Sequence, residues 1–369
     1  MASRAHAPDY LFMGGIALLT VFGLVMLASA TNAVGFEKFG DTYYFLKRQA
    51  LFGLLPGIAA FLLCLRLPYG AFRKARTVIF LASLALLGLV LVPGIGASFG
   101  RTQSWLSIGG FSLQPAELAK IGIILFLAGW LDERRDGAIQ TIRYGLAPFL
   151  IIMGIVATLL ALQPDVGTLA IILAIGFSLL IIAGARWKHI VVLLILGAVA
   201  FGALVAAAPY RVERLTTFLH PELDPQGAGY QINQAFLAIG TGGWFGVGLG
   251  HSRQKFQYLP EVASDSIFAV IAEELGFVAA GALVLLLVII WLRMLRIARA
   301  APDAFGRFAV FGVAVWFMAQ AWLNIGAMVG LLPLTGLPLP FVSHGGTALL
   351  AALAGAGMVA RISQFTKPL

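Results

Sequence analysis

The sequence predicts an all-α polytopic membrane protein with ten transmembrane helices, both termini in the cytoplasm, and one large extracytoplasmic loop between helices 7 and 8. Of its 369 residues, 60% are hydrophobic and 11% are charged. A soluble domain of this length could not cover its surface with so few polar groups. Apolar segments also recur at the length of about 20 residues that a bilayer requires. We therefore treat residues 1–369 as one integral membrane domain, in which residues 209–266 form the extracytoplasmic loop.

Hydropathy gives the approximate bounds of the segments that are expected to cross the bilayer. They are 10–30, 48–65, 77–96, 115–131, 146–163, 167–184, 189–208, 267–291, 308–331 and 343–360. The first is long, lacks a small-residue cleavage site and is followed by many similar segments, so it is not a cleaved signal peptide. Cys64 is the only cysteine, which excludes a disulfide within the chain and a cysteine-based metal site.

Basic residues set the orientation of these segments. Lysines and arginines gather in alternate loops, as in residues 66–76, 134–143 and 293–307, whereas the loop after the ninth segment has no charge. Because cytoplasmic loops carry an excess of Lys and Arg, the basic loops are placed inside the cell. The net charge of +9 would indicate nucleic-acid binding in a soluble protein. Here it reflects the cytoplasmic loops, and no nucleic acid is expected as a partner.

The long outer loop contains two distinctive stretches. Residues 229–240 are amphipathic, and residues 240–250 are rich in glycine. Long loops in compact proteins tend to be functional, and glycines let a backbone approach a ligand or bend sharply. A re-entrant turn that packs on the helix bundle would explain the same glycines, and the sequence leaves both interpretations open.

Residues 246–276 are the most informative part of the chain. Six Asp, Glu, Lys and Arg residues lie there between apolar segments, at a boundary where charge near hydrocarbon is costly. They are Arg253, Lys255, Glu261, Asp265, Glu273 and Glu274. Two cations followed by carboxylates and a helix start indicate a site for an anionic substrate with a general base beside it. Asp265 is the candidate base, although an aspartate at this position would also suit the N-cap of the eighth span.

Two further polar groups lie at the outer ends of spans. Pro115 suits the first turn of the fourth span, and Glu117 and Lys120 then share a helix face at i,i+3 spacing. They are expected to form a structural ion pair or to line a pocket. Asp165, in the tight turn between the fifth and sixth spans, is expected to cap the helix that begins near Gly167.

The segment 333–347 carries a third group of polar residues. Its three prolines make a rigid entry to the last span, where Ser343 and His344 can present donors to an anion at a helix N-terminus. His344 could titrate near neutral pH, but a lone histidine is more often a hydrogen-bonding spacer. Asn324, in the middle of the ninth span, is expected to hydrogen-bond a neighbouring helix.

Several stretches of the chain resemble one known family. Five stretches are similar to motifs of the SEDS family (shape, elongation, division and sporulation). They are LQPAELAK, LQPDVGT, GYQINQAFLAIGTGGWFGVGLG, RQKFQYLPEVASDSIFAVIAEELG and LLPLTGLPLPFVSHGGTALL. Its members are ten-span peptidoglycan glycosyltransferases of the bacterial inner membrane. The resemblance runs from Asp9 to about Arg361, in the family order. GVGLGHSRQKFQYLPE resembles the division-type members more than the elongation-type members.

The resemblance implies that the chain polymerises lipid II, a polyprenyl-pyrophosphate-linked disaccharide peptide, at the outer face of the membrane. Asp265 would be the catalytic general base, and pyrophosphate or sugar would contact a set of substrate-binding candidates. These are Arg101, Trp105, Arg253, Lys255, Glu261, Ser343 and His344. The chain departs from the family where Ser266 and His344 each replace an aromatic residue and where Ser264 replaces threonine, so the local substrate contacts are open.

The resemblance also implies partners. A class B penicillin-binding protein, which is a crosslinking transpeptidase, and other proteins of a division or elongation complex are expected. The sequence requires no cofactor and shows no metal-ligand spacing. A divalent cation, Mg²⁺ or Mn²⁺, on the pyrophosphate stays open.

A lipid II flippase is the alternative function. Under that hypothesis Glu117, Lys120, Glu273 and Glu274 would line a pathway across the membrane, and an internal repeat would be expected. No repeat is evident, and the polar residues crowd toward the outer face rather than the midplane. This distribution favours an outer-leaflet enzyme, while a scaffold for division proteins would leave the clustered charges unexplained.

Overall fold

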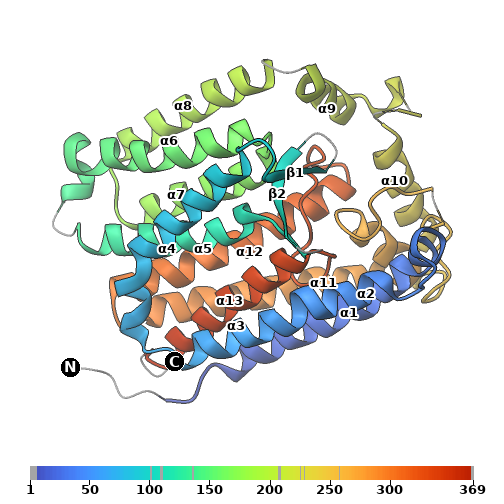
Figure 1. Cartoon of the computed structure of the whole chain (residues 1–369), viewed down its shortest axis with the longest axis horizontal. Coiled ribbons are helices and arrows are strands. Elements are labelled where there is room, and N and C mark those ends of the chain that lie inside the picture. Colours follow the sequence, from blue (N-terminus) through green and yellow to red (C-terminus); the bar gives the residue numbers. More distant parts are fainter. Residues whose placement is uncertain are drawn as a thin grey trace.

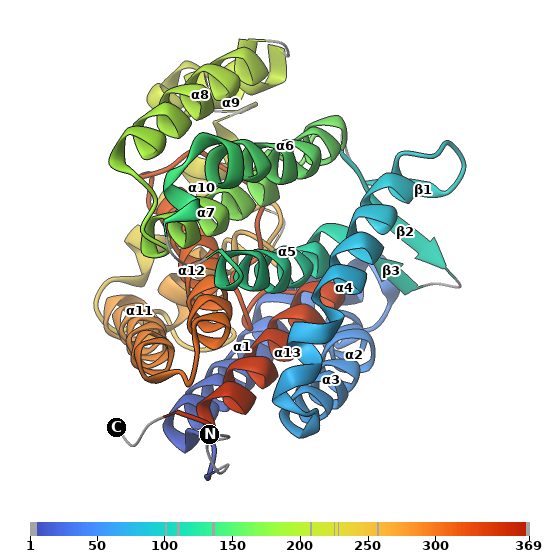
Figure 2. The same ribbon diagram turned by 90° about the vertical axis from the view of Figure 1, so that its left-hand side faces the viewer.

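The computed structural model describes residues 6–99, 102–108, 111–134, 137–206, 209–224, 226–227, 229–256 and 258–366. In these ranges the protein is nearly all helical, with long helices packed side by side and one small sheet at the end of the bundle (Figure 1). The chain termini lie together at one end of the long helices, and α10 lies at the other end. Figure 2 shows α8 and α9 at the periphery and α12 near the centre.

In its described residues, the first half of the chain forms eight α-helices and three strands. They are α1 (Tyr10–Phe39), α2 (Tyr44–Gln49), α3 (Leu55–Arg66), α4 (Tyr69–Val90), β1 (Gly96–Phe99), β2 (Thr102–Ile108), β3 (Phe111–Leu113), α5 (Pro115–Asp132), α6 (Ala147–Leu162), α7 (Val166–Ile182) and α8 (Trp187–Ala206). The second half is helical: α9 (Pro209–Leu219), α10 (Tyr230–Gly242), α11 (Ile267–Ala300), α12 (Ala304–Met328) and α13 (Gly346–Ser363). A short π-helical turn, Ala50–Leu54, joins α2 to α3 without a break.

Each predicted apolar segment coincides with a helix or, for the second segment, with the continuous run from α2 to α3. Within the described ranges, six helical segments are long and apolar enough to cross a membrane. They are Tyr10–Phe39, Tyr44–Arg66, Ile142–Leu162, Ile267–Ala300, Ala304–Met328 and Gly346–Ser363. The apolar segments Val166–Ile182 and Trp187–Ala203 are shorter. The protein is therefore a multi-pass membrane protein with a helical fold.

Residues 96–99, 102–108 and 111–113 contradict the all-α prediction. They form an antiparallel sheet of order β1-β2-β3, in which Ala97 pairs with Trp105 and Leu106 pairs with Leu113. The third span, predicted as 77–96, accordingly ends at Val90. Pro93 lacks the amide proton that a helix needs, and Gly94 has a φ of +86°. The chain therefore leaves the helix and turns into β1.

Local sequence signals explain where several helices begin and end. The Asp9 carboxylate accepts the Phe12 N–H at 3.0 Å and caps α1, which ends at Gly40 with a φ of 67°. Asp303 caps α12 in the same way by accepting the Gly306 N–H at 2.8 Å. These caps satisfy helix-end N–H groups that would otherwise lack partners.

The core of the bundle lies around α5, α12 and α13, whose apolar side chains are largely buried. In contrast, α8 exposes Val192, Leu194, Ile195 and Val199, and α11 exposes Phe277 and Leu285. A helix with such an apolar outer surface is unfavourable in water but is compatible with lipid acyl chains. The peripheral helices thus present a hydrocarbon-facing surface, and the polar residues gather inside.

Helix α11 is broken at Gly276, which has a φ of 77° and a ψ of −178°. The segment after α10 fills the break with backbone hydrogen bonds. The Val247 and Gly248 N–H groups donate to the carbonyl oxygens of Glu273 and Glu274, both at 3.0 Å. The Phe277 N–H donates to the Gly243 carbonyl oxygen at 2.9 Å. The glycine-rich segment is therefore a turn packed on the bundle, and it satisfies backbone groups that the break would leave unpaired.

Gly246→Ala should destabilise this junction. Gly246 has a φ of +79°, and an added Cβ would lie 2.2 Å from the Glu274 carbonyl oxygen. Left-handed strain and overpacking together cost about 2–4 kcal/mol, so the unfolding temperature in detergent should fall by several degrees. Gly240→Ala, in α10 with open space around it, is the matched control and should be neutral or stabilising. Equal unfolding temperatures for the two variants would contradict this account of the junction.

Candidate active site

Asp265 lies in the turn immediately before α11. The N-cap position of α11 is Ser266, and no side chain caps this end of the helix. The Asp265 side chain is 7% exposed, and its Oδ1 accepts a hydrogen bond from Gln231 Nε2 at 3.2 Å. Asp265 therefore does not cap α11, although its position in the sequence allowed that role. Its carboxylate is turned toward α10 instead.

Burial, and after it the negative charge of Glu261, raise the pKa of Asp265, which lies at about 6. The Gln231 hydrogen bond and the positive charge of Arg214 oppose this shift. At about pH 7 most of the carboxylate is ionised, yet its affinity for a proton is far higher than that of a solvated aspartate. A carboxylate with these properties suits general-base chemistry, which is most efficient when the pKa lies near the working pH.

The backbone around Asp265 is fixed from the opposite side by α12 and the segment 331–345. Asn324 Nδ2 donates to the carbonyl oxygens of Asp265 and Leu337, both at 2.8 Å. The His344 N–H donates to the Ala263 carbonyl oxygen at 2.7 Å. Asn324 was predicted to contact a neighbouring helix, but its amide joins two non-helical segments. It therefore holds the turn that carries the candidate base.

Ser343 does not have the substrate-binding role predicted for it. Its side chain is 4% exposed, its hydroxyl donates to the Ser264 carbonyl oxygen, and it accepts the Leu339 N–H at 2.8 Å. Both bonds are internal to the protein. Ser343 therefore joins the segment 331–345 to the turn before α11.

His344 is not the neutral-range titrating group that the sequence allowed. Burial, with the nearby positive charge of Arg48, lowers its pKa to about 4. The imidazole is half-buried and meets the Phe45 ring edge-on, with 5.4 Å between ring centroids. His344 is thus neutral at physiological pH and can contribute polarity or stacking to a substrate site, but not positive charge.

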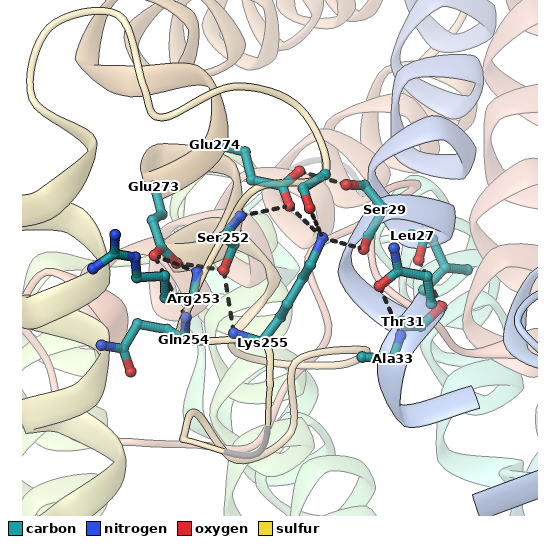
Figure 3. A network of polar contacts seen from close by, with 12 residues as sticks. Leu27, Ser29, Thr31, Ala33, Ser252, Arg253, Gln254, Lys255, Glu273 and Glu274 are labelled. Carbon is teal, nitrogen blue, oxygen red and sulfur yellow. Dashed lines mark hydrogen bonds and ion pairs between the residues drawn. The ribbon is translucent and has the colours of Figure 1, made fainter. Parts of the chain in front are cut away.

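The contacts of Lys255 also differ from its predicted role in binding substrate (Figure 3). Its side chain is 0% exposed, and its ammonium group contacts Glu274 Oε1 at 2.9 Å. The same group donates to the carbonyl oxygens of Gly250 at 2.8 Å and Ser29 at 3.1 Å. All three donors are occupied, so Lys255 has none left for a pyrophosphate. It is a structural cation that holds the outer loop to α1 and α11.

Glu273 and Glu274 organise the rest of this loop. Glu273 Oε1 accepts the Arg253 N–H at 2.9 Å, and Glu273 Oε2 accepts the Ser252 hydroxyl proton. Glu274 Oε2 accepts the Ser29 hydroxyl proton. In Figure 3 both carboxylates point into this network. The flippase hypothesis required them to line an open pathway, whereas here they are enclosed and hydrogen-bonded.

The predicted ion pair between Glu117 and Lys120 is confirmed, with 2.8 Å between Glu117 Oε1 and Lys120 Nζ. Lys120 also donates to Gln320 Oε1 at 2.8 Å and lies 4.8 Å from the centre of the Trp316 ring. Gln320 Nε2 in turn donates to the Pro338 carbonyl oxygen at 2.9 Å. This buried group therefore ties α5 and α12 to the segment 331–345.

The remaining predicted residues lie around this frame. Asp165 caps α7 by accepting the Thr168 N–H at 3.0 Å, as predicted. Trp105 is half-buried in β2, and Arg101 lies outside the described residues. Arg253 and Glu261 are exposed. Figure 3 shows the Arg253 guanidinium turned away from Lys255, so Arg253 stays a candidate for contact with substrate.

Two residues near Asp265 were missed by the sequence analysis. Gln231, the second residue of α10, contacts the carboxylate directly. Arg214, on α9, donates to the Leu334 carbonyl oxygen at 3.3 Å and acts electrostatically on Asp265. The sequence contained one signal for each of them. Gln231 is a polar residue at the start of the amphipathic stretch 229–240, and Arg214 is a basic residue in the predicted loop 209–266.

Comparisons with known proteins match this arrangement. The family model FTSW_RODA_SPOVE, described as "Cell cycle protein", matches residues 9–368. The chain belongs to the FtsW/RodA/SpoVE family. A relative from Bacillus subtilis (strain 168), stage V sporulation protein E, is 40% identical over 369 residues and is covered completely, as is this chain. A probable peptidoglycan glycosyltransferase FtsW from Geobacter sp. (strain M18) is 37% identical over 360 residues, 98% of each chain. The SEDS resemblance is thus confirmed.

Solved structures of the family share the fold. A chain described under "Structural coordination of polymerization and crosslinking by a peptidoglycan synthase complex" superposes with a TM-score of 0.81 at 30% identity, covering 97% of this chain and 98% of that one. The rod shape determining protein RodA of Thermus thermophilus superposes with a TM-score of 0.71 at 29% identity, covering 97% of each chain. The FtsW names among the relatives agree with the division-type resemblance.

The buried pair of Lys255 and Glu274 gives a stability prediction. Lys255→Met leaves the Glu274 carboxylate buried without its cation, which costs about 3–5 kcal/mol. The unfolding temperature of the purified protein should therefore fall markedly, and adding Glu274→Gln should restore part of the loss. Arg253→Met removes the same charge from an exposed side chain two residues away and should change stability by less than about 0.5 kcal/mol. Equal losses in Lys255→Met and Arg253→Met would argue against a buried structural pair.

Proposed function

We propose that this protein is a peptidoglycan glycosyltransferase that polymerises lipid II into glycan strands in cell division or cell shape. The observation that carries the proposal is the Asp265 carboxylate, which is buried, held in a fixed turn, unused as a helix cap and raised in pKa to about 6. The FtsW name of the Geobacter relative, which designates a probable peptidoglycan glycosyltransferase, supports this assignment.

In the proposed reaction Asp265 accepts the proton of a sugar hydroxyl on the acceptor. The hydroxyl oxygen then forms a bond to the anomeric carbon of the donor, and the bond between that carbon and the pyrophosphate oxygen breaks. The electron pair leaves with the polyprenyl pyrophosphate. Cations should stabilise the departing negative charge, and Arg253, Arg214 and Arg101 are the candidates for this role.

A divalent cation on the pyrophosphate remains a proposal that rests on phosphate chemistry alone. In the described part of the chain, no three His, Cys, Asp or Glu side chains are grouped as a metal site.

We further propose ten spans in the bacterial inner membrane, with both termini cytoplasmic and Asp265 facing the periplasm or exterior. The basic loops support this orientation, and so does the position of α10 at the end of the helices opposite the termini (Figure 1). A reporter fused after Arg299 should be active in the cytoplasm, and one inserted between Leu223 and Asp224 should be active only outside it. A cytoplasmic signal at Asp224 would refute the orientation and place Asp265 away from an outer-leaflet substrate.

We also propose a class B penicillin-binding protein as the partner, so that strand polymerisation is coupled to crosslinking. The structural similarity to a chain described as part of a peptidoglycan synthase complex supports this. The polymerisation assay should therefore compare the purified protein alone with the protein bound to such a transpeptidase. A polymerisation rate that does not respond to the partner would count against functional coupling.

Asp265→Asn tests the function directly. The substitution keeps size and polarity but removes the proton acceptor, so lipid II polymerisation should fall by about 100- to 10,000-fold. Asp265→Glu should also retain little activity, because catalytic geometry tolerates a shift of about 1 Å poorly. Size-exclusion behaviour and partner binding should match the unmodified protein, because Asp265 caps no helix. A polymerisation rate equal to that of the unmodified protein would exclude Asp265 as the base and make Glu261 the next candidate.

A further inference from the structure

We propose that Gln231 is a positioning residue that orients the Asp265 carboxylate for proton acceptance. The proposal rests on the general-base function proposed above for Asp265. Gln231 Nε2 donates to Asp265 Oδ1 at 3.2 Å and lies 3.0 Å from Ser266 Oγ. Both hydrogen bonds cross from α10 to the start of α11, so they join two elements that are 34 or 35 residues apart in sequence.

The chemistry of the amide suits this role. An NH₂ group has two donors, and here they can hold the carboxylate and its neighbouring hydroxyl in one relative orientation. The contact engages one carboxylate oxygen and leaves the other available to an incoming hydroxyl. A donated hydrogen bond also favours the ionised carboxylate, and Gln231 accordingly lowers the pKa of Asp265 against the effects of burial and Glu261. Only the ionised form can accept a proton.

The scaffold holds Gln231 in place. Ile232 and Ala235 of α10 are buried, which fixes the helix that carries the amide. At its far end α10 continues into the segment 243–248, which is hydrogen-bonded to the break in α11. The side chain therefore extends from a backbone that is anchored at both ends. Asn324 holds the Asp265 backbone from α12, so the carboxylate and its peptide are restrained by two different helices.

A purely structural role is the competing explanation, in which Gln231 only attaches α10 to α11. The two explanations differ in the pH profile. If Gln231 acts on the carboxylate, removing its amide raises the pKa of Asp265, and the acidic limb of kcat/KM must move to higher pH. If Gln231 only attaches the helix, stability falls and the acidic limb stays where it is.

The test is the pH dependence of lipid II polymerisation by the full-length protein, bound to its transpeptidase partner where polymerisation requires one. In Gln231→Leu the acidic limb should move up by about one pH unit, as expected for the loss of one hydrogen bond to a carboxylate. The plateau at higher pH should remain about tenfold low, because the ionised base is no longer oriented. Gln231→Met keeps the length of the side chain and should show the same shift as Gln231→Leu. It serves as a second variant in case Gln231→Leu does not fold.

Two control variants make the test specific. Gln234→Leu makes the same change on the same helix, at a side chain that makes no hydrogen bond to Asp265, and should leave the limb unmoved. Glu261→Gln removes the like charge that raises the pKa of Asp265, so its limb should move to lower pH. A hydrophobic carbodiimide labels the protonated form of Asp265, and peptide mass spectrometry measures the labelling at each pH. The midpoint of labelling reports the protonation of Asp265 independently of turnover. In each variant this midpoint should shift in the same direction as the acidic limb of kcat/KM.

An unmoved acidic limb and labelling midpoint in both Gln231 variants would overturn the proposal, and so would an equal shift in Gln234→Leu. Asp265→Asn in the same assay separates this inference from the proposed function. If Asp265→Asn is inactive and the Gln231 variants show no shift, only the positioning role fails. If Asp265→Asn remains fully active, the general-base function itself fails.

Discussion

The break in α11 is the constraint on which the half of the protein around α10 and Asp265 depends. An interrupted helix near a bilayer leaves backbone groups that need partners. The segment 243–248 supplies them, and it can approach closely because Gly246 has no side chain. Once this segment is docked, Lys255 lies beside Glu274, and α10 is held so that Gln231 reaches Asp265. The place of the candidate base thus follows from a backbone requirement at Gly276.

The uncharged segment 331–345 is the second element that this half depends on. Its prolines have no N–H to satisfy, while its carbonyl oxygens are acceptors for side chains of several helices. Arg214 donates to Leu334, Asn324 to Leu337 and Gln320 to Pro338. A rigid, acceptor-rich segment therefore connects the buried ion pair of α5 to the turn before α11. This frame holds the backbone of the turn that carries Asp265.

Much of the fold could be predicted because apolar runs of membrane length are a strong signal, and each one coincides with helix. The sheet of β1, β2 and β3 could not, because β1 and β3 are short and the sequence of β2 has no clear apolar alternation. In the site, Asp265 was found as a charge beside an apolar helix. Lys255 was misassigned because its partner, Glu274, lies 19 residues away, a spacing that no local pattern reveals. Gln231 was missed because an uncharged amide acquires its role only from the tertiary contact.

The buried cluster of Ser252, Lys255, Glu273 and Glu274 also constrains how the protein enters the membrane. The segment with Lys255 emerges from the ribosome before the segment with Glu273 and Glu274. Until the second segment is in place, the Lys255 charge has no partner at the membrane boundary. An uncompensated charge in such a place costs several kcal/mol. Under the proposed orientation, we therefore expect export of the glycine-rich segment and insertion of α11 to be coupled, since the charges compensate one another only when both segments lie on the same side of the membrane. The ion pair that fixes the folded loop would then also favour its correct placement during membrane insertion.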